Sequence, residues 1–281
     1  MTLPPNPVAA QAARPRRPRS RTRRWLAILA VGWVVVLAGS AVFAFRHPNP
    51  TARDQTSVEQ ARPTVDEAVA RIAAAAAADG GAAVALSSFE HVGSCDVTVF
   101  RSGERYRRGL TVVVPPGGES GLLTRVADRL PASYRTVVGT GEAPRLTADA
   151  GFWVLVTAAR IGPGEVRFYA DTGDCREAGR VDTSDPAVVV DEAPIREVLE
   201  RLNLTVADRR TAAVSCPGGG MIGTVEVHAG TYPGALDAAL REVGTHEVVA
   251  APRLYAFRDG STQVAVRAHD DQVIITATEG C

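Results

Sequence analysis

An internal duplication constrains the fold of this chain more than any other feature. The phrase Val65-Asp66-Glu67-Ala68 returns as Val190-Asp191-Glu192-Ala193. After each copy the chain continues through a Ser-Cys pair, a strand, a short helix, a Pro-Arg-Leu triplet and two closing strands, in the same order. Because chance does not repeat such a series, the chain is predicted to hold two copies of one structural unit.

Each copy is predicted to begin with a helix. In the first copy Thr64 and Glu67 form a capping-box pattern, which predicts a helix start there and a run to Asp79-Gly80-Gly81. In the second copy Pro194 stands early, and the apolar residues that follow have helical spacing: Ile195, Val198, Leu199 and Leu202. The short second helices have the same spacing, at Leu122, Leu123, Val126 and Leu130 and at Leu236, Leu240 and Val243.

The strands complete the unit. They are predicted at 110–114 and 223–227, and as closing pairs at 152–161 with 165–171 and at 262–269 with 272–278. The fold class is therefore α+β, with two tandem α-β-β-α-β-β(-β) units. Each is expected to form a two-layer sandwich, with its helices on one face of a mainly antiparallel sheet. The strand order stays open.

The four cysteines are predicted to form two disulfides. Four cysteines allow three pairings, and the repeat favours one of them, Cys95–Cys175 and Cys216–Cys281. At separations of 80 and 65 residues, loop entropy predicts a stabilisation of about 4 to 4.5 kcal/mol for each bond. A redox pair or a metal site is the alternative, but the sequence has no Cys-x-x-Cys, and His91 alone has metal-ligand spacing to a cysteine.

The net charge of zero conceals an uneven distribution. All 31 basic residues are arginines; the first 46 residues hold eight and no Asp or Glu, which leaves 23 arginines against 31 acidic residues in the other 235. Residues 25–45 carry no charge and are long enough for a bilayer. By the positive-inside rule we expect a transmembrane helix, a cytoplasmic N-terminus and an extracytoplasmic remainder at the plasma membrane. A cleaved signal peptide with Val42 and Ala44 before the cleavage site is the alternative.

These features divide the chain into six segments. We expect a disordered Arg/Pro-rich tail (1–24), the transmembrane helix (25–45), a linker (46–63), copy one (64–175), a second linker (176–188) and copy two (189–281).

The search for catalytic residues gives one candidate, Asp171. Asp171-Thr172-Gly173 resembles the Asp-Thr-Gly element of aspartic proteases, which implies a carboxylate pair that shares a proton. The second copy has Ala277-Thr278-Glu279 at the equivalent place, and Asp174 replaces the usual Ala or Ser. A strand-ending turn beside a disulfide is the favoured interpretation.

Two further motifs have structural interpretations. Arg105-Tyr106-Arg107-Arg108 could meet an acidic partner but is expected to be the solvated face of a hairpin. Pro217-Gly-Gly-Gly220 lacks the Gly-Lys-Ser/Thr of a phosphate-binding loop, so a hairpin connection beside Cys216 is expected.

The sequence therefore predicts a single-pass bacterial envelope protein whose duplicated modules bind or scaffold an unknown envelope partner. We expect no catalysis, no cofactor or metal, and no nucleic-acid partner, since the exported part is acidic. The alternatives are a membrane-tethered hydrolase that uses Asp171, a form secreted after signal-peptide cleavage, and a spacer without a ligand.

Overall fold

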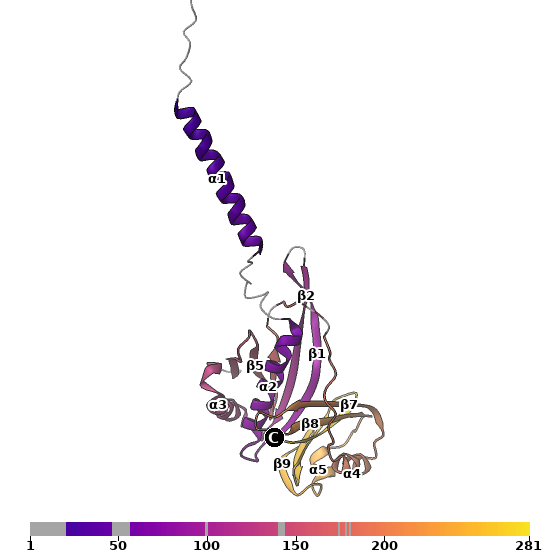
Figure 1. The fold of residues 1–281 in the computed structure, drawn as a ribbon. Helices are drawn as coiled ribbons and strands as arrows, with labels where there is room; N and C mark the ends of the chain where they lie inside the picture. The colour runs from indigo at the N-terminus through magenta and orange to yellow at the C-terminus, as the bar shows by residue number, and fades with distance from the viewer. Residues whose placement is uncertain are drawn as a thin grey trace, which may run out of the picture. The chain divides into compact units, whose positions relative to one another are not determined.

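The chain divides into two compact units, Met1–Pro50 and Thr51–Cys281 (Figure 1). The computed structural model describes residues 21–46, 57–98, 101–139, 144–173, 175–177, 179 and 181–281. Most of the predicted tail (1–24) and of the predicted linker (46–63) lies outside these ranges.

The first unit contributes helix α1 (Arg21–Arg46). This helix covers the apolar segment 25–45, for which the sequence predicted a transmembrane span on length and lack of charge. Within the residues that the structure describes, however, no helix has both the length and the apolarity needed to cross a membrane. The predicted transmembrane helix is therefore not confirmed.

The second unit contains the duplicated fold. Its first half consists of α2 (Val58–Ala77), β1 (Ala83–Thr98), β2 (Arg101–Val113), α3 (Glu119–Arg129), the 3-10 turn η1 (Ala132–Tyr134), β3 (Val137–Gly139), β4 (Arg145–Asp149), β5 (Leu155–Gly162) and β6 (Glu165–Asp171). Its second half consists of α4 (Ala193–Leu202), β7 (Val206–Ser215), β8 (Met221–Ala229), α5 (Leu236–Leu240), β9 (His246–Ala251), β10 (Leu254–Asp259), β11 (Thr262–Ala268) and β12 (Val273–Glu279).

Each half forms one six-stranded antiparallel sheet, and the two sheets have the same topology. The strand order is β1-β2-β6-β5-β4-β3 in the first sheet and β7-β8-β12-β11-β10-β9 in the second. The α+β class and the equivalence of the two copies are thus confirmed. Each copy has six strands, more than the four or five predicted, because the segments after the second helix also pair.

Helix α2 begins earlier than the sequence predicted. Its N-cap is Ser57, whose hydroxyl accepts a hydrogen bond from the Gln60 backbone N–H while the Gln60 side chain accepts one from the Ser57 N–H. This capping box supplies partners for backbone groups that a helix start leaves unpaired. The predicted cap at Thr64 is wrong, and Pro63 lies inside the helix, one turn and a half after its start.

The first predicted closing strand also begins later, at Leu155. Phe152 and Trp153 form a turn in the left-handed backbone region, with φ of 50° and 62°. Both side chains are exposed, and the Arg176 guanidinium donates a hydrogen bond to the Phe152 carbonyl. The turn therefore leaves two aromatic side chains on the surface.

Helices cover one face of each sheet. The helix-facing side chains of β6 are Val166, Phe168 and Ala170, which pack with the buried faces of α2 and α3 in one core. In the second half α4 and α5 pack on the second sheet in a separate core. Figure 1 shows α2 and α3 on one side of the unit and α4 and α5 at the opposite end.

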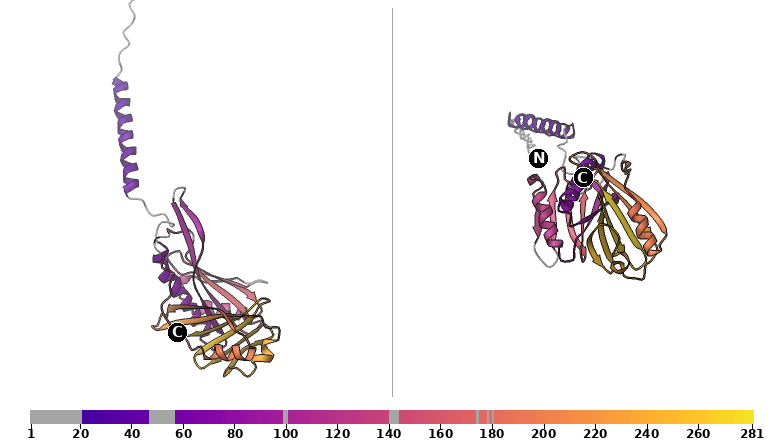
Figure 2. Two further views of the ribbon diagram at one scale, coloured as in Figure 1. Left: turned by 90° about the vertical axis from the view of Figure 1, so that its right-hand side faces the viewer. Right: turned by 90° about the horizontal axis from the view of Figure 1, so that it is seen from below.

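The two sheets pack against each other through their other faces, which the further views of Figure 2 show. A small apolar cluster, which includes Ala83, Val113 and Ala265, joins them. The edge strand β1 also receives hydrogen-bond partners: the Val84 N–H donates to Gln263 Oε1 (3.2 Å) and the Leu86 N–H to Thr224 Oγ1 (2.9 Å). The second sheet thereby covers an edge that would otherwise expose unpaired backbone groups.

Candidate functional site

Both predicted disulfides are present. Cys95–Cys175 joins the distal part of β1 to the segment after β6, and Cys216–Cys281 joins the end of β7 to the last residue, each with a Cα–Cα distance of 5.6 Å. No free cysteine occurs among the described residues. Both bonds therefore close a repeat from its first strand to its end, as the duplication predicted.

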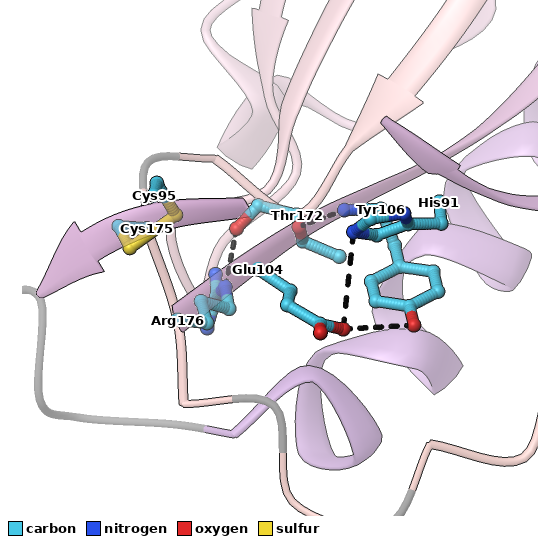
Figure 3. Close-up of a disulfide and its surroundings, with 7 residues drawn as sticks. All are labelled: His91, Cys95, Glu104, Tyr106, Thr172, Cys175 and Arg176. Atoms are coloured by element: carbon cyan, nitrogen blue, oxygen red, sulfur yellow. Dashed lines mark hydrogen bonds and ion pairs between the residues drawn. A yellow bond between two sulfur atoms is a disulfide. The ribbon is translucent and has the colours of Figure 1, made fainter. Parts of the chain in front are cut away.

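The first disulfide lies in a two-stranded extension formed by β1 and β2 (Figure 3). Strand β6 pairs with β2 from Arg107 to Val113, and beyond this stretch the strand partner of β2 is β1. Glu104 and Arg176 exchange backbone hydrogen bonds of 2.8 and 3.2 Å beside Cys175. The disulfide and this bridge fix a hairpin that lacks a third strand.

The histidine beside this disulfide has a packing role. His91 Nε2 lies 3.9 Å from Glu104 Oε2, and its ring is tilted against Tyr106 with centroids 5.1 Å apart. Its neighbour Cys95 is disulfide-bonded. Among the described residues no group of three or more His, Cys, Asp or Glu side chains could hold a metal ion.

Asp171 ends strand β6 in a turn. Its Oδ1 accepts a hydrogen bond from the Gly173 N–H (2.8 Å), and Gly173 has a φ of 83°. Burial raises the pKa of the Asp171 carboxyl, against the lowering effects of this hydrogen bond and of nearby arginines. The geometry is that of the strand-ending turn that the sequence favoured; Asp174 lies outside the described residues.

The prediction of a solvated face for residues 105–108 is wrong for Tyr106, which is 8 % exposed, and for Arg108. This guanidinium is 0 % exposed and lies under α2. It donates to Asp66 Oδ1 (2.8 Å), to the Ser87 carbonyl (3.0 Å) and to both oxygens of Asp185 (2.9 and 2.6 Å). Strand alternation explains the error, because Arg107 and Arg108 point to opposite faces of the sheet.

Arg108 connects the two halves. Asp185 belongs to the segment between the repeats, and its Oδ2 also accepts from the Ala213 N–H of β7 (3.2 Å). Arg62 of α2 donates to Asp185 as well (3.0 Å). Burial raises the pKa of the Asp66 carboxyl, and this effect exceeds the lowering by Arg108 and Arg62. Burial lowers the pKa of the Arg108 guanidinium, but its interactions with Asp185 and Asp66 outweigh this effect, so the pKa of Arg108 is raised overall.

A polar cavity lies between the two sheets. Its volume is about 520 Å³, and its lining includes Arg107, Arg167 and Tyr169 from the first sheet and Arg210, Glu226 and Arg267 from the second. Glu90 and Glu165 also line it, so four arginines face three glutamates. We call this space the inter-sheet cavity. It is the place where the two copies bring charged groups together.

Arg267 is the most buried charged group of the inter-sheet cavity. It is 6 % exposed, and its Nε has no hydrogen-bond partner among the described residues. Its two nearest carboxylate contacts are long, 4.0 Å to Glu165 Oε1 and 3.8 Å to Glu226 Oε2. Burial lowers the pKa of Arg267, opposed by these two glutamates.

The other arginines of the cavity differ in how they are neutralised. Arg107 donates to Glu90 (2.6 Å) and lies over the Tyr169 ring, 4.2 Å from its centroid. Arg210 donates to Asp208 (2.8 Å). Arg167 donates its Nε–H to a neutral partner, Thr111 Oγ1 (3.2 Å). The cavity thus holds two incompletely neutralised guanidinium groups, Arg167 and Arg267, one from each sheet.

A histidine lies behind Glu226. His228 contacts Glu226 Oε1 through Nε2 (2.9 Å) and Gln272 Oε1 through Nδ1 (3.0 Å). The contact with Gln272 raises the pKa of His228, burial lowers it, and Glu226 raises it again, with a net increase. Both partner atoms are acceptors, so the protonated ring satisfies both contacts.

Sequence reasoning singled out none of the residues that line the inter-sheet cavity except Arg107, within the 105–108 cluster. The available signal was the alternation in β6, where Glu165, Arg167 and Tyr169 alternate with buried apolar residues. Such a polar face is usually solvated, so this alternation alone does not predict a cavity there.

Comparison with known proteins adds no functional information. No protein-family model matches the chain, and no curated protein is detectably similar in sequence. Any functional conclusion therefore depends on the geometry described above.

Proposed function

We propose that residues 57–281 form a binding module that acts outside the cytoplasm and holds a small polar ligand between its two sheets. The observation that carries this proposal is the inter-sheet cavity, lined by charged side chains of both copies. Its volume of about 520 Å³ falls within the range of roughly 300 to 1,000 Å³ that is usual for small-molecule sites. Its charged lining favours a polar ligand over an apolar one.

The two disulfides support the extracytoplasmic location. Structural disulfides persist in oxidising compartments and are rare in the cytoplasm. Mass spectrometry of the protein from its native cells, alkylated before lysis, tests this part. We expect Cys95–Cys175 and Cys216–Cys281 as bridged peptides; free thiols at these positions would contradict the location.

Binding rather than catalysis is favoured by the state of the one catalytic candidate. The Asp171 carboxylate is occupied by the turn that ends β6, where it accepts the Gly173 N–H. No specific observation supports the hydrolase alternative.

The binding proposal is tested with a small set of polar probes. The full-length oxidised chain, kept in solution with a mild detergent, is heated in the presence of succinate, inorganic phosphate, glucose or putrescine. Each probe is used at about 10 mM, a concentration high enough to detect a dissociation constant in the millimolar range. We expect one chemical class to raise the melting temperature, since a ligand that binds only the folded state stabilises it. Absence of any shift, or conversion of a bound probe into product, would contradict the proposed function.

A further inference from the structure

We propose that the ligand of the inter-sheet cavity is a small oxyanion compound, carrying carboxylate or phosphate groups, held between Arg267 and Arg167. This inference rests on the proposed function and names the chemical class of its ligand.

The Arg267 guanidinium is buried, but its hydrogen bonding within the described residues is incomplete. It lines the inter-sheet cavity from the middle of the second sheet and is 6 % exposed. Its Nε is unpartnered in the described chain, and its contacts with Glu165 and Glu226 are 4.0 and 3.8 Å long. Buried arginine is normally satisfied by close, often bidentate, contacts with oxyanions. The unpaired Nε–H of Arg267 therefore points to an oxyanion ligand.

Arg167 supplies the second positive group from the opposite sheet. Arg167 and Arg267 line the same cavity from the two sheets, and the positive charge of Arg167 adds to the effect of burial that lowers the pKa of Arg267. Two like charges so placed repel each other, and an anion between them removes this repulsion. A ligand that accepts hydrogen bonds from both residues would also hold the two sheets together.

The remaining cavity arginines are less suited to the same role. Arg107 is bonded to Glu90 and stacked on Tyr169, and Arg210 is bonded to Asp208. Their charges are already balanced at 2.6 and 2.8 Å. This difference predicts that substitution of Arg167 or Arg267 weakens binding more than substitution of Arg210.

Glu165 and Glu226 set the selectivity of the site. Both carboxylates are too far from Arg267 for direct hydrogen bonds, so an oxyanion can take the closer positions. Glu165 Oε1 is also buried without a hydrogen-bond partner among the described residues. A ligand that donates a hydroxyl or amino hydrogen to Glu165 while its oxyanion meets the arginines would satisfy both groups. A hydroxy or amino acid, or a sugar phosphate, has this combination.

The test is isothermal titration of the full-length oxidised chain with four probes. These are malate, glycerol 3-phosphate, inorganic phosphate and malamide, the neutral diamide of malate. We expect malate or glycerol 3-phosphate to bind at least about tenfold more tightly than malamide, because hydrogen bonds to charged groups are worth about 1.5–3 kcal/mol, about tenfold or more in affinity. The preferred probe distinguishes a carboxylate from a phosphate ligand.

Three variants locate the site. Arg267→Gln and the less buried Arg167→Gln should each weaken the preferred anion at least about tenfold, while the exposed Arg253→Gln, outside the cavity, should not change its affinity. Arg167→Gln keeps the test valid if Arg267→Gln fails to fold. Equal affinity for malate and malamide, or unchanged affinity in both cavity variants, would overturn the proposal. If glucose or putrescine binds in the cavity instead, the anion inference fails while the proposed function stands; if no probe binds, both fail.

Discussion

At the scale of single residues, the buried ion cluster around Arg108 determines how the two halves are joined. Its guanidinium reaches α2 through Asp66, β1 through the Ser87 carbonyl and the inter-repeat segment through Asp185. A buried pair contributes little net stability when complete, but removal of one partner leaves the other charge uncompensated. Arg108 is therefore more important for joining these elements than any exposed ion pair.

We predict that Arg108→Met destabilises the protein by about 3–5 kcal/mol, because Asp66 and Asp185 would be left without their main cation. Urea unfolding of the full-length chain measures the loss. The control Arg71→Met removes an arginine from an exposed pair with Glu67, one turn apart on α2, and should cost no more than about 0.5 kcal/mol. A loss below about 1 kcal/mol for Arg108→Met would contradict the role of the cluster.

Gly103 is the glycine on which the first disulfide depends. A Cβ at this position would lie 2.3 Å from the Arg176 carbonyl oxygen and 2.7 Å from Cys175 Sγ. We predict that Gly103→Ala costs about 1–3 kcal/mol, as overpacking against rigid neighbours does. Gly218→Ala, where the added Cβ meets nothing within 4 Å, is the matched control in the same thermal unfolding measurement. Equal melting temperatures of the two variants would show that the backbone at Arg176 can move aside.

His228 predicts a pH dependence of stability. Its pKa is raised in the folded state, so its contribution is fully present below the unfolded value of about 6.5 and is lost as pH rises through the folded value. The charged groups around it are Glu226, Asp208 and Arg210. Unfolding free energies measured from about pH 5.5 to about pH 8.5, which is from about one unit below to about two units above the usual His pKa, should decrease across this window.

The variant His228→Gln should remove this part of the pH dependence, whereas the exposed His246→Gln should leave it unchanged. The slope from one histidine cannot exceed about 1.4 kcal/mol per pH unit. A profile that is the same in the parent chain and in His228→Gln would exclude His228 as the titrating group.

At the scale of elements, the β1–β2 hairpin depends on its covalent attachment. Beyond Arg107 its described strands pair with each other, and hydrogen bonds of Tyr106 with Thr172 and of Glu104 with Arg176 join them to the segment after β6. An isolated two-stranded hairpin is marginally stable in water. We predict that the double variant Cys95→Ser/Cys175→Ser increases amide hydrogen exchange in residues 91–106 more than in β7–β12. The loss of stability should approach about 4.5 kcal/mol.

The pair Cys216→Ser/Cys281→Ser is the matched comparison. It removes the equivalent bond of the second copy, so its exchange should increase near Cys216 and along the end of β12 instead. If both double variants produced the same exchange pattern, the two bonds would not act on separate elements.

At the scale of the whole molecule, the sequence predicted the features that occur in both copies and those that depend on neighbouring residues. The buried stripe of α4, the closing strand β6 and the pairing of the four cysteines follow from spacing and from comparison of the two copies. The shared strand order and the contact between the sheets depend on residues far apart in the chain, and no local pattern encodes them. Alternation identifies a polar face but does not say whether water or a second sheet meets it, and for this reason Arg267 and Arg167 were missed.

The two covalent loops have a mechanical consequence. A force that pulls the chain apart between α2 and the C-terminal residue acts along the path through Cys95–Cys175 and Cys216–Cys281. The loops that these bonds close, with separations of 80 and 65 residues, carry no tension and cannot lengthen. A protein built in this way can be stretched by only a fraction of its contour length while its disulfides remain, so it transmits load over a short and fixed distance.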